Sequence, residues 1–202
     1  LDGGGIGTVV KVTVNNTSIT RFTIQNSGYK DAGINLDHSS GNNISYNIII
    51  NNDFGILLDY SCNNIIADNT FTSNHDCGIV LENSDNNVII GNNISETASI
   101  LEGDGICLED SGDNLIAGNI LSNNKNSGII IGNSCFNNVT RNTIHNSYNG
   151  IFVGADCVGS SCKNCSYNNI VGNIISGNEH GIRGDAANNN TFNDNDVSYN
   201  NY

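Results

Sequence analysis

A dipeptide, Gly-Ile, recurs along the chain at intervals close to 22 residues, and this repeat limits the fold more than any other feature. It occurs seven times, with spacings of 22, 23, 27, 23, 22 and 31 residues. The glycines are Gly33, Gly55, Gly78, Gly105, Gly128, Gly150 and Gly181. Repeats of this length are typical of solenoids, in which each unit packs only against its neighbours. The sequence therefore predicts a stack of similar units.

Asparagine divides each repeat into three short apolar segments. An Asn-Asn or Asp-Asn pair follows most of the glycines, and a single Asn comes a few residues later. These later residues are Asn47, Asn69, Asn92, Asn119, Asn142, Asn173 and Asn195. Asn and Gly tolerate the left-handed backbone of a sharp bend, and Asn side chains stacked in successive units can hydrogen-bond as a ladder. We expect them at the corners of each unit.

Apolar residues alternate within the segments, as Ile34 with Leu36 and Ile79 with Leu81 do. Alternation predicts strands with two or three inward side chains. Strands this short, repeated in one direction, can pair only with the equivalent strand one unit away. We therefore predict an all-β fold, a single-stranded right-handed parallel β-helix of about eight coils of 22–23 residues, roughly 40 Å long. In the less regular first coil, we expect Val10, Val12, Val14, Ile19, Phe22 and Ile24 to point inward.

The composition does not change abruptly, so residues 1–202 are predicted to form one domain. Two coils are longer than the rest, with insertions at about 96–104 and 156–165. The sequence begins almost in a strand and stops part-way round a repeat. Either the chain is a fragment or its open coil edges pair with neighbouring copies, and we expect the second. No apolar run is long enough to span a membrane and no signal peptide is present, so we expect a secreted chain whose signal has been removed.

The formal net charge of −13, with only seven Lys and Arg residues, excludes several partners. Nucleic acid and anionic membrane surfaces both require a positive surface on the protein. We therefore expect no nucleic-acid binding, no membrane insertion and no polyanionic partner.

Seven cysteines suggest an oxidising exterior, and an odd number cannot all pair within one chain. Cys135 and Cys157 take the same position in adjacent repeats, which predicts a separation that a disulfide accepts; the alternative is two stacked thiols. Cys162 and Cys165 form a CxxC in the second insertion. We expect a loop disulfide there, with half of a metal site or a redox pair as the alternatives.

Three further cysteines are candidates for free thiols or for bonds between chains, namely Cys62, Cys77 and Cys107. Cys77 precedes its glycine and Cys107 follows its own by two residues, so these two are out of register. The sequence therefore predicts that they are poor partners for each other.

Carboxylates recur in two columns. Four residues after the glycine lie Asp37, Asp59, Glu82 and Glu109, and two residues before it lie Asp31, Asp53, Asp76 and Glu179. Like charges one coil apart raise one another's pKa or recruit cations, so the first column is a candidate cation-binding or carbohydrate-cleaving face. The alternative is a solvated ridge. No cofactor is expected other than calcium. Histidines and arginines share no column and aromatic residues look scattered, which argues against a carbohydrate enzyme.

Sequons for N-glycosylation are frequent, as expected of a surface protein, although an Asn-rich repeat generates them without any glycan. They begin at Asn15, Asn16, Asn43, Asn93, Asn138, Asn164 and Asn189.

Residues 55–71 and 128–144 resemble the parallel β-helix repeats of the NosD-like family, and the opening Leu1–Gly5 with residues 18–26 resembles the start of such domains. The resemblance covers essentially the whole chain and implies the fold. Such repeats occur in periplasmic copper-maturation proteins, in polysaccharide lyases, hydrolases and epimerases, and in surface and sheath proteins of methanogenic archaea. For copper, the sequence offers no Met and no His cluster.

Uncapped ends, acidity and an odd cysteine count favour an extracellular structural protein, with copies of itself as partners. We expect it to assemble edge to edge into an archaeal sheath, surface layer or fibre locked by disulfides. The alternative is a carbohydrate-active enzyme or binding module with a polysaccharide partner on the acidic face. A weaker alternative is a metal-handling module of NosD type.

Overall fold

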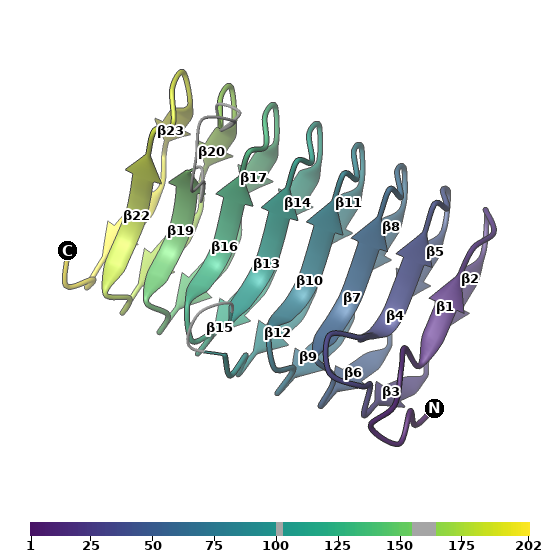
Figure 1. Cartoon of the computed structure of the whole chain (residues 1–202). Helices are drawn as coiled ribbons and strands as arrows, with labels where there is room; N and C mark the ends of the chain where they lie inside the picture. Colours follow the sequence, from purple (N-terminus) through teal and green to yellow (C-terminus); the bar gives the residue numbers. More distant parts are fainter. Residues whose placement is uncertain (100–102, 155–164) are drawn as a thin grey trace.

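The structure is a computed structural model, and it describes residues 1–99, 103–154 and 165–202. Within these ranges all regular secondary structure is β, arranged as three parallel sheets of eight strands each. No helix in the described part of the chain is long and apolar enough to cross a membrane. Figure 1 shows the strands side by side along a rod, with the termini at opposite ends. The predicted parallel β-helix is confirmed.

Sheet 1 contains the long strands, most of which have six residues. Its strands are β1 (Val10–Val12), β4 (Ala32–Asp37), β7 (Phe54–Asp59), β10 (Cys77–Glu82), β13 (Asp104–Glu109), β16 (Ser127–Gly132), β19 (Asn149–Gly154) and β22 (His180–Asp185).

Sheets 2 and 3 are built from three-residue strands. Sheet 2 comprises β2 (Ser18–Thr20), β5 (Asn43–Ser45), β8 (Ile65–Ala67), β11 (Val88–Ile90), β14 (Leu115–Ala117), β17 (Asn138–Thr140), β20 (Asn169–Val171) and β23 (Thr191–Asn193). Sheet 3 comprises β3 (Thr23–Gln25), β6 (Ile48–Ile50), β9 (Thr70–Thr72), β12 (Asn93–Ser95), β15 (Ile120–Ser122), β18 (Thr143–His145), β21 (Ile174–Ser176) and β24 (Asp196–Ser198).

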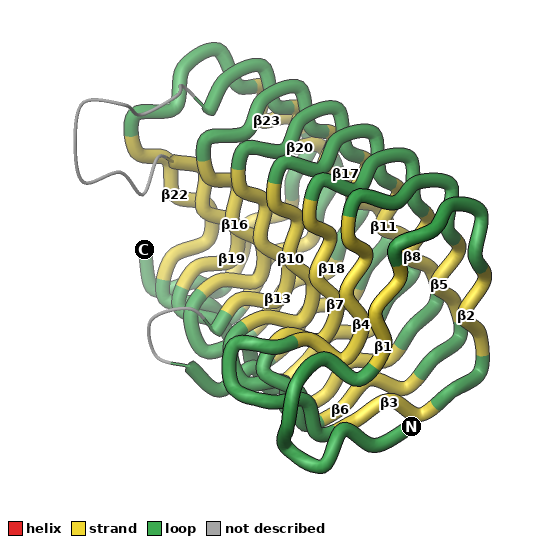
Figure 2. The backbone as a smooth tube through the Cα atoms, turned by 45° about the vertical axis from the view of Figure 1, so that its right-hand side comes forward, coloured by secondary structure: helices red, strands yellow, loops and turns green. Residues whose placement is uncertain are grey.

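Every strand pairs with its equivalent in the next coil, so the repeat in the sequence becomes a stack in space (Figure 2). Ile56, Ile79 and Ile106, which each follow a glycine, are opposite one another on β7, β10 and β13. Their side chains are fully buried, as are those of Leu58, Leu81 and Leu108. Burial of these stacked aliphatic rows is the main source of stability, at about 25 cal/mol per Å² of apolar surface.

The glycine of the repeat is needed because the coils approach each other closely there. A Cβ atom at Gly78 would lie 2.5 Å from Cγ2 of Ile94 and 2.7 Å from the carbonyl oxygen of Gly105. Any larger residue would push the core or the next coil away, which explains why Gly-Ile recurs.

The predicted asparagine ladders are present at the corners and are buried. In one corner each side-chain amide donates to the Oδ1 of the next coil, from Asn47 through Asn69, Asn92, Asn119, Asn142 and Asn173 to Asn195. The Asn pairs form a second ladder through Asn42, Asn64, Asn87, Asn114, Asn137, Asn168 and Asn190. Each ladder satisfies polar groups that the tight bends would otherwise bury unpaired.

The first coil differs from the prediction at two positions. Val12, Ile19 and Ile24 are buried as expected, but Val14 is 62% exposed and Phe22 is 47% exposed. The reason is that β1 ends at Val12 and β3 begins at Thr23, so both residues lie in bends where alternation no longer applies.

Candidate functional site

The acidic column lies at one edge of sheet 1. Strands β4, β7, β10 and β13 end at Asp37, Asp59, Glu82 and Glu109, and the strand register places these four residues opposite one another in succession. The column predicted from the sequence therefore exists, and Gly132 follows Glu109 on β16. Adjacent strands are about 4.8 Å apart, so neighbouring carboxylates lie close enough to repel one another.

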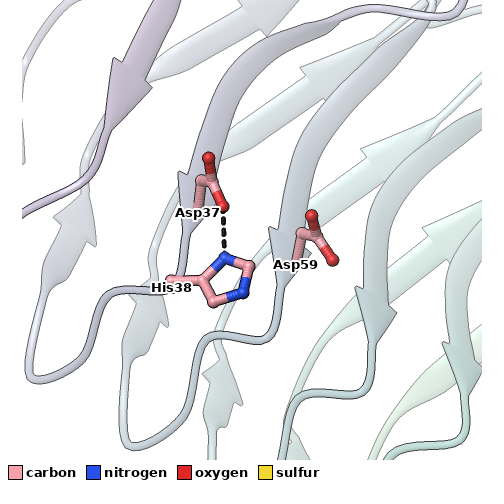
Figure 3. Close-up of side chains that lie close together, drawn as sticks. All are labelled: Asp37, His38 and Asp59. Carbon is pink, nitrogen blue, oxygen red and sulfur yellow. Dashed lines mark hydrogen bonds and ion pairs between the residues drawn. The ribbon is translucent and has the colours of Figure 1, made fainter.

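Asp37 is the member of the column that has cationic partners. Its carboxylate lies 2.8 Å from Nζ of Lys11. It also lies 2.5 Å from Nδ1 of His38, as Figure 3 shows beside Asp59. The hydrogen bond from Lys11, and then that from His38, lowers the pKa of Asp37, and the same carboxylate raises the pKa of Lys11. Asp37, His38 and Asp59 each offer a metal-ligand atom within 4.8 Å of the others. A cation at this end would compete with Lys11.

Glu82 has the opposite environment. Partial burial raises its pKa, and the negative charges of Glu109 and then Asp59 raise it further. One column therefore contains a carboxyl group that holds its proton more tightly than usual and another that loses it more easily.

A groove of about 300 Å³ lies beside Glu82 and Glu109 on the outer face of sheet 1. Its apolar lining includes Phe54, Val80 and Ile130. Carboxylates at the rim of an apolar hollow can hydrogen-bond the hydroxyls of a sugar whose ring faces pack on the apolar surface.

Two cysteines, Cys77 and Cys107, line the same groove. Their backbones are out of register as expected, because Cys77 is opposite Asp104 and Cys107 is opposite Val80. The two side chains nevertheless interact, since Cys77 shares a hydrogen bond with Cys107, but no disulfide joins them. This hydrogen bond, burial and the nearby Cys107 and Asp104 raise the pKa of the Cys77 thiol.

No disulfide joins the described cysteines Cys62, Cys77, Cys107, Cys135 and Cys165 to one another. Cys157 and Cys162 lie outside the described residues. The predicted pairs of Cys135 with Cys157 and of Cys162 with Cys165 each include one of them and therefore stay predictions. The described neighbour of Cys135 in the next coil is Ser166, whose amide donates to the Cys135 sulfur at 3.4 Å. Bonds between chains through Cys62, Cys77 or Cys107 stay a prediction.

The second carboxylate column contains an arrangement that the sequence analysis missed. Nδ1 of His75 lies 3.2 Å from Asp53 Oδ1 and 2.9 Å from Asp76 Oδ1. Both aspartates are 7% exposed, whereas the imidazole side chain is 57% exposed. Buried carboxylates thus orient an exposed imidazole, which leaves Nε2 to exchange a proton with a ligand. The adjacency of His75 to Asp76 in the sequence was the available signal.

The prediction that aromatic side chains are scattered is also wrong. Rings from successive coils lie 5.0 to 5.4 Å apart between centroids. These groups are His38 with Tyr60, Phe136 with Tyr167, and Tyr148 with His180 and Tyr202. His38 and Tyr60 directly follow Asp37 and Asp59, so an aromatic surface adjoins the acidic column. His38 and Tyr60 each lie five residues after their glycine, so the spacing could have revealed this pair, whereas the insertion between Phe136 and Tyr167 hides the alignment of the second pair.

The described sequon asparagines are all exposed, which is compatible with modification. They are Asn15, Asn16, Asn43, Asn93, Asn138 and Asn189, and Asn164 lies outside the described residues. Glycosylation stays a prediction.

A family model described as periplasmic copper-binding protein (NosD) matches residues 5–149 and 96–202. The chain belongs to the NosD family. The resemblance seen in the repeats is thereby confirmed. A comparison with curated proteins gave no match.

Several solved structures share the fold of this NosD-family chain. The periplasmic alginate epimerase AlgG is 24% identical with a TM-score of 0.80, over 90% of this chain and 45% of that one. The A-module of the Azotobacter vinelandii mannuronan C-5 epimerase AlgE4 is 18% identical with a TM-score of 0.80, over 94% of this chain and 55% of that one. An alginate lyase from Paenibacillus sp. str. FPU-7 is 12% identical with a TM-score of 0.67, over 96% and 88% of the two chains. The chain thus spans about half the length of the epimerases.

The expected function as a self-assembling sheath or surface-layer protein is wrong. The solved structures that share this fold include alginate epimerases and an alginate lyase, and none of those named above is a sheath or surface-layer protein. The expectation rested on the coil ends and on cysteine pairing, and no disulfide links the described cysteines to one another. The outer face of sheet 1, which carries the groove beside the acidic column, is therefore the candidate functional surface.

Proposed function

We propose that the protein is a carbohydrate-active enzyme that binds a polysaccharide across the outer face of sheet 1 and cleaves a glycosidic bond beside Glu82. The observation that carries the proposal is the pairing of Glu82 with Glu109 on adjacent strands at the rim of the groove. Polysaccharide-active proteins with the same fold support it.

The two carboxyl groups are suited to different steps. Glycoside hydrolysis needs one carboxyl group that holds its proton more tightly than usual and a second that is ionised. Glu82 fits the proton donor, because burial and its negative neighbours raise its pKa. Glu109 fits the nucleophile, since neighbouring strands about 4.8 Å apart approach the carboxyl separation of about 5 Å found in retaining enzymes.

The charge of the chain favours a neutral polysaccharide as substrate. A net charge of −13 repels a polyuronate such as alginate unless cations bridge the two. The apolar groove and the stacked rings of His38 and Tyr60 would pack against the faces of uncharged sugar rings.

A second candidate reaction is proton removal from the carbon atom next to a sugar carboxylate, followed by epimerisation or elimination. His75 favours it, because Asp53 and Asp76 hold its imidazole with the ring exposed. Lys30 and Tyr29 lie close to this group. The backbone amide of Lys30 donates to Asp53 Oδ2 at 2.5 Å, and Lys30 Nζ lies 5.7 Å from the centroid of the Tyr29 ring. Lys30 would supply a positive charge for the carboxylate of a uronate, and Tyr29 would supply a phenol hydroxyl.

An envelope or extracellular location is part of the proposal. The family is described as periplasmic, and the epimerase AlgG is a periplasmic enzyme. A polysaccharide substrate is most accessible in those compartments.

The test is incubation of the purified protein with a panel of neutral and uronate polysaccharides, measuring new reducing ends and unsaturated products. We expect new reducing ends from a neutral polymer. Glu82→Gln should lower the rate at least about 100-fold while binding persists, because the proton donor is lost. Glu96→Gln, at a separate corner, is the matched control and should keep full activity.

Other outcomes decide between the candidates. Unsaturated products that disappear in His75→Ala and persist in Glu82→Gln would establish the second reaction. Binding without any product would leave a carbohydrate-binding module. If neither a sugar nor calcium raises the melting temperature of the monomer and no product forms, the proposal is refuted.

Copper is the ligand that the family description names. Cu(II) favours clusters of imidazoles, but each described cluster of three ligand-type side chains contains a single His. Cu(I) favours thiolates, and the thiol pair of Cys77 and Cys107 provides two sulfur atoms in contact. The described residues therefore fit Cu(I) and not Cu(II).

A further inference from the structure

Asp53, His75 and Asp76 form a cluster at a corner that joins two adjacent coils. Asp53 lies in one coil, and the other two residues lie in the next. Backbone hydrogen bonds hold the two coils together at this corner. The His75 amide donates to the Asn52 carbonyl at 2.7 Å, and the Asp76 amide donates to the Asp53 carbonyl at 2.9 Å. The three side chains therefore meet on a fixed part of the backbone.

The cluster buries more negative charge than its neighbours neutralise. Both aspartates are 7% exposed, and no Lys or Arg in the described part of the chain forms an ion pair with either of them. His75 Nδ1 lies 3.2 Å from Asp53 Oδ1 and 2.9 Å from Asp76 Oδ1, but a ring nitrogen carries at most one hydrogen. Even a protonated imidazole would leave one negative charge uncompensated. Buried charges in proteins are paired or coordinate metals, so the cluster requires a further positive charge.

The three ligand atoms have the spacing of a metal site. Zn²⁺ binds histidine nitrogen and carboxylate oxygen at about 2.0–2.2 Å, which places two tetrahedral ligands about 3.3 Å apart. The two distances from His75 Nδ1 are close to this value, and all three atoms lie within 4.8 Å of one another. A hollow of about 440 Å³, lined by Asp53, His75 and Tyr29 among others, adjoins the cluster and would admit water to a fourth position.

A second cluster with the same residue types lacks this need for a cation. Asp37, His38 and Asp59 also offer ligand atoms within 4.8 Å of one another. Asp37 already has a cationic partner, because Nζ of Lys11 lies 2.8 Å away, and its side chain is 24% exposed. The side chain of Asp53 is 7% exposed and has no such partner among the described residues. A metal ion is therefore favoured at Asp53 over Asp37.

We propose that Asp53, His75 and Asp76 bind one Zn²⁺ ion through one oxygen of each carboxylate and Nδ1 of the imidazole. Three protein ligands and a water are the usual set of an open zinc site. The metal takes the place of any hydrogen on Nδ1, the neutral imidazole keeps its hydrogen on Nε2, and no electron is transferred. His75 then has no free nitrogen to accept a proton, so zinc binding and the second candidate reaction exclude each other. The proposed hydrolysis beside Glu82 does not involve these residues.

The test is a titration of the metal-free, reduced chain with Zn²⁺, followed by long-range proton–nitrogen NMR of its four imidazole rings. Cysteines elsewhere also bind zinc, but they leave the His75 ring unchanged. As Zn²⁺ saturates the chain, we expect the Nδ1 resonance of His75 to shift and Nε2 to keep its hydrogen, while the His38 ring stays as it was. A His75 ring that is unaffected by excess Zn²⁺ would refute the proposal.

His75→Gln is the decisive variant, because this side chain is 57% exposed and its substitution should leave the unfolding curve unchanged. We expect it to lose one Zn²⁺ equivalent, counted against a chromophoric chelator. Asp76→Asn should weaken that equivalent by at least about 10-fold, the smallest loss usual even for a residue that only supports a ligand. His38→Gln is the matched control and should keep the wild-type number. If folded His75→Gln binds as many equivalents as His38→Gln, the cluster is an ion pair and the proposal is wrong.

Discussion

The asparagine ladders and the acidic column both repeat one polar residue per coil, yet they behave in opposite ways. In the ladders each amide donates to the coil on one side and accepts from the coil on the other, as Asn92 does with Asn119 and Asn69. These side chains are about 1% exposed. In the column, Glu82 and Glu109 are adjacent with no donor between them, and the charges raise the pKa of Glu82.

The difference lies in the hydrogen-bonding groups. An amide carries both a donor and an acceptor, so a stack of amides satisfies itself and can be buried. A carboxylate carries only acceptors, so a stack of carboxylates needs water, cations or a ligand to supply donors. Periodic amides therefore stabilise the coil, and periodic carboxylates leave binding capacity on its surface.

Converting one ladder residue into a carboxylate should have the largest effect. Asn92 donates from Nδ2 to Asn119 Oδ1 at 3.0 Å and to the Ile66 carbonyl at 2.9 Å. Asn92→Asp would bury a carboxylate against these acceptors, and we expect the free energy of unfolding to fall by roughly 4 kcal/mol. Urea denaturation measures this. Asn93→Asp, at the adjacent exposed position, should change stability by less than about 0.5 kcal/mol. Equal effects in the two variants would mean that the ladder contributes no special stability.

Converting one carboxylate of the column into an amide should have a smaller and opposite effect. Glu82→Gln removes the repulsion with Glu109 and Asp59, and we expect stability at neutral pH to rise by a few tenths of a kcal/mol, because solvent screens this half-exposed group.

The pH dependence of Glu82 follows from its raised pKa. Its contribution to stability is fully present below the pKa of the unfolded chain and is lost as the pH rises through the folded pKa. Wild type should therefore lose stability over this range relative to Glu82→Gln, as measured by urea unfolding at several pH values. Glu96→Gln serves as the control, and a pH profile for Glu82→Gln that parallels wild type would contradict the assignment.

The smallest expected effect concerns the one column residue that has a cationic partner. Lys11→Gln should raise the pKa of Asp37 toward its ordinary value, because the hydrogen bond from Lys11 is the largest cause of its lowering. In wild type the stabilising contribution of Asp37 is present above the unfolded pKa and is lost as the pH falls through the lowered folded pKa. A carboxyl NMR titration of Asp37 measures the shift, with Lys30→Gln as control. An unchanged pKa in Lys11→Gln would show that His38 alone holds the carboxylate.

Most of the fold could be predicted because a solenoid repeats short-range rules. Alternating Ile and Leu after each glycine identifies the core, and a regular interval identifies what stacks on what. The same logic located Asp37, Asp59, Glu82 and Glu109 correctly, since each ends a strand of the same length. It failed at Val14 and Phe22, because bends interrupt the alternation and are not periodic.

The sequence by itself determined the strands, the corners, the family and the acidic column, because these depend on spacing along the chain. The tertiary structure decided which member of each Asn pair is buried in the ladder. The buried member is the first of the pair at Asn42 and Asn137, and the second of the pair at Asn64 and Asn87. It also brought together Cys77 with Cys107 and His75 with Asp53. Those contacts depend on how side chains leave a bent backbone and on how one coil is offset from the next, and linear spacing specifies neither.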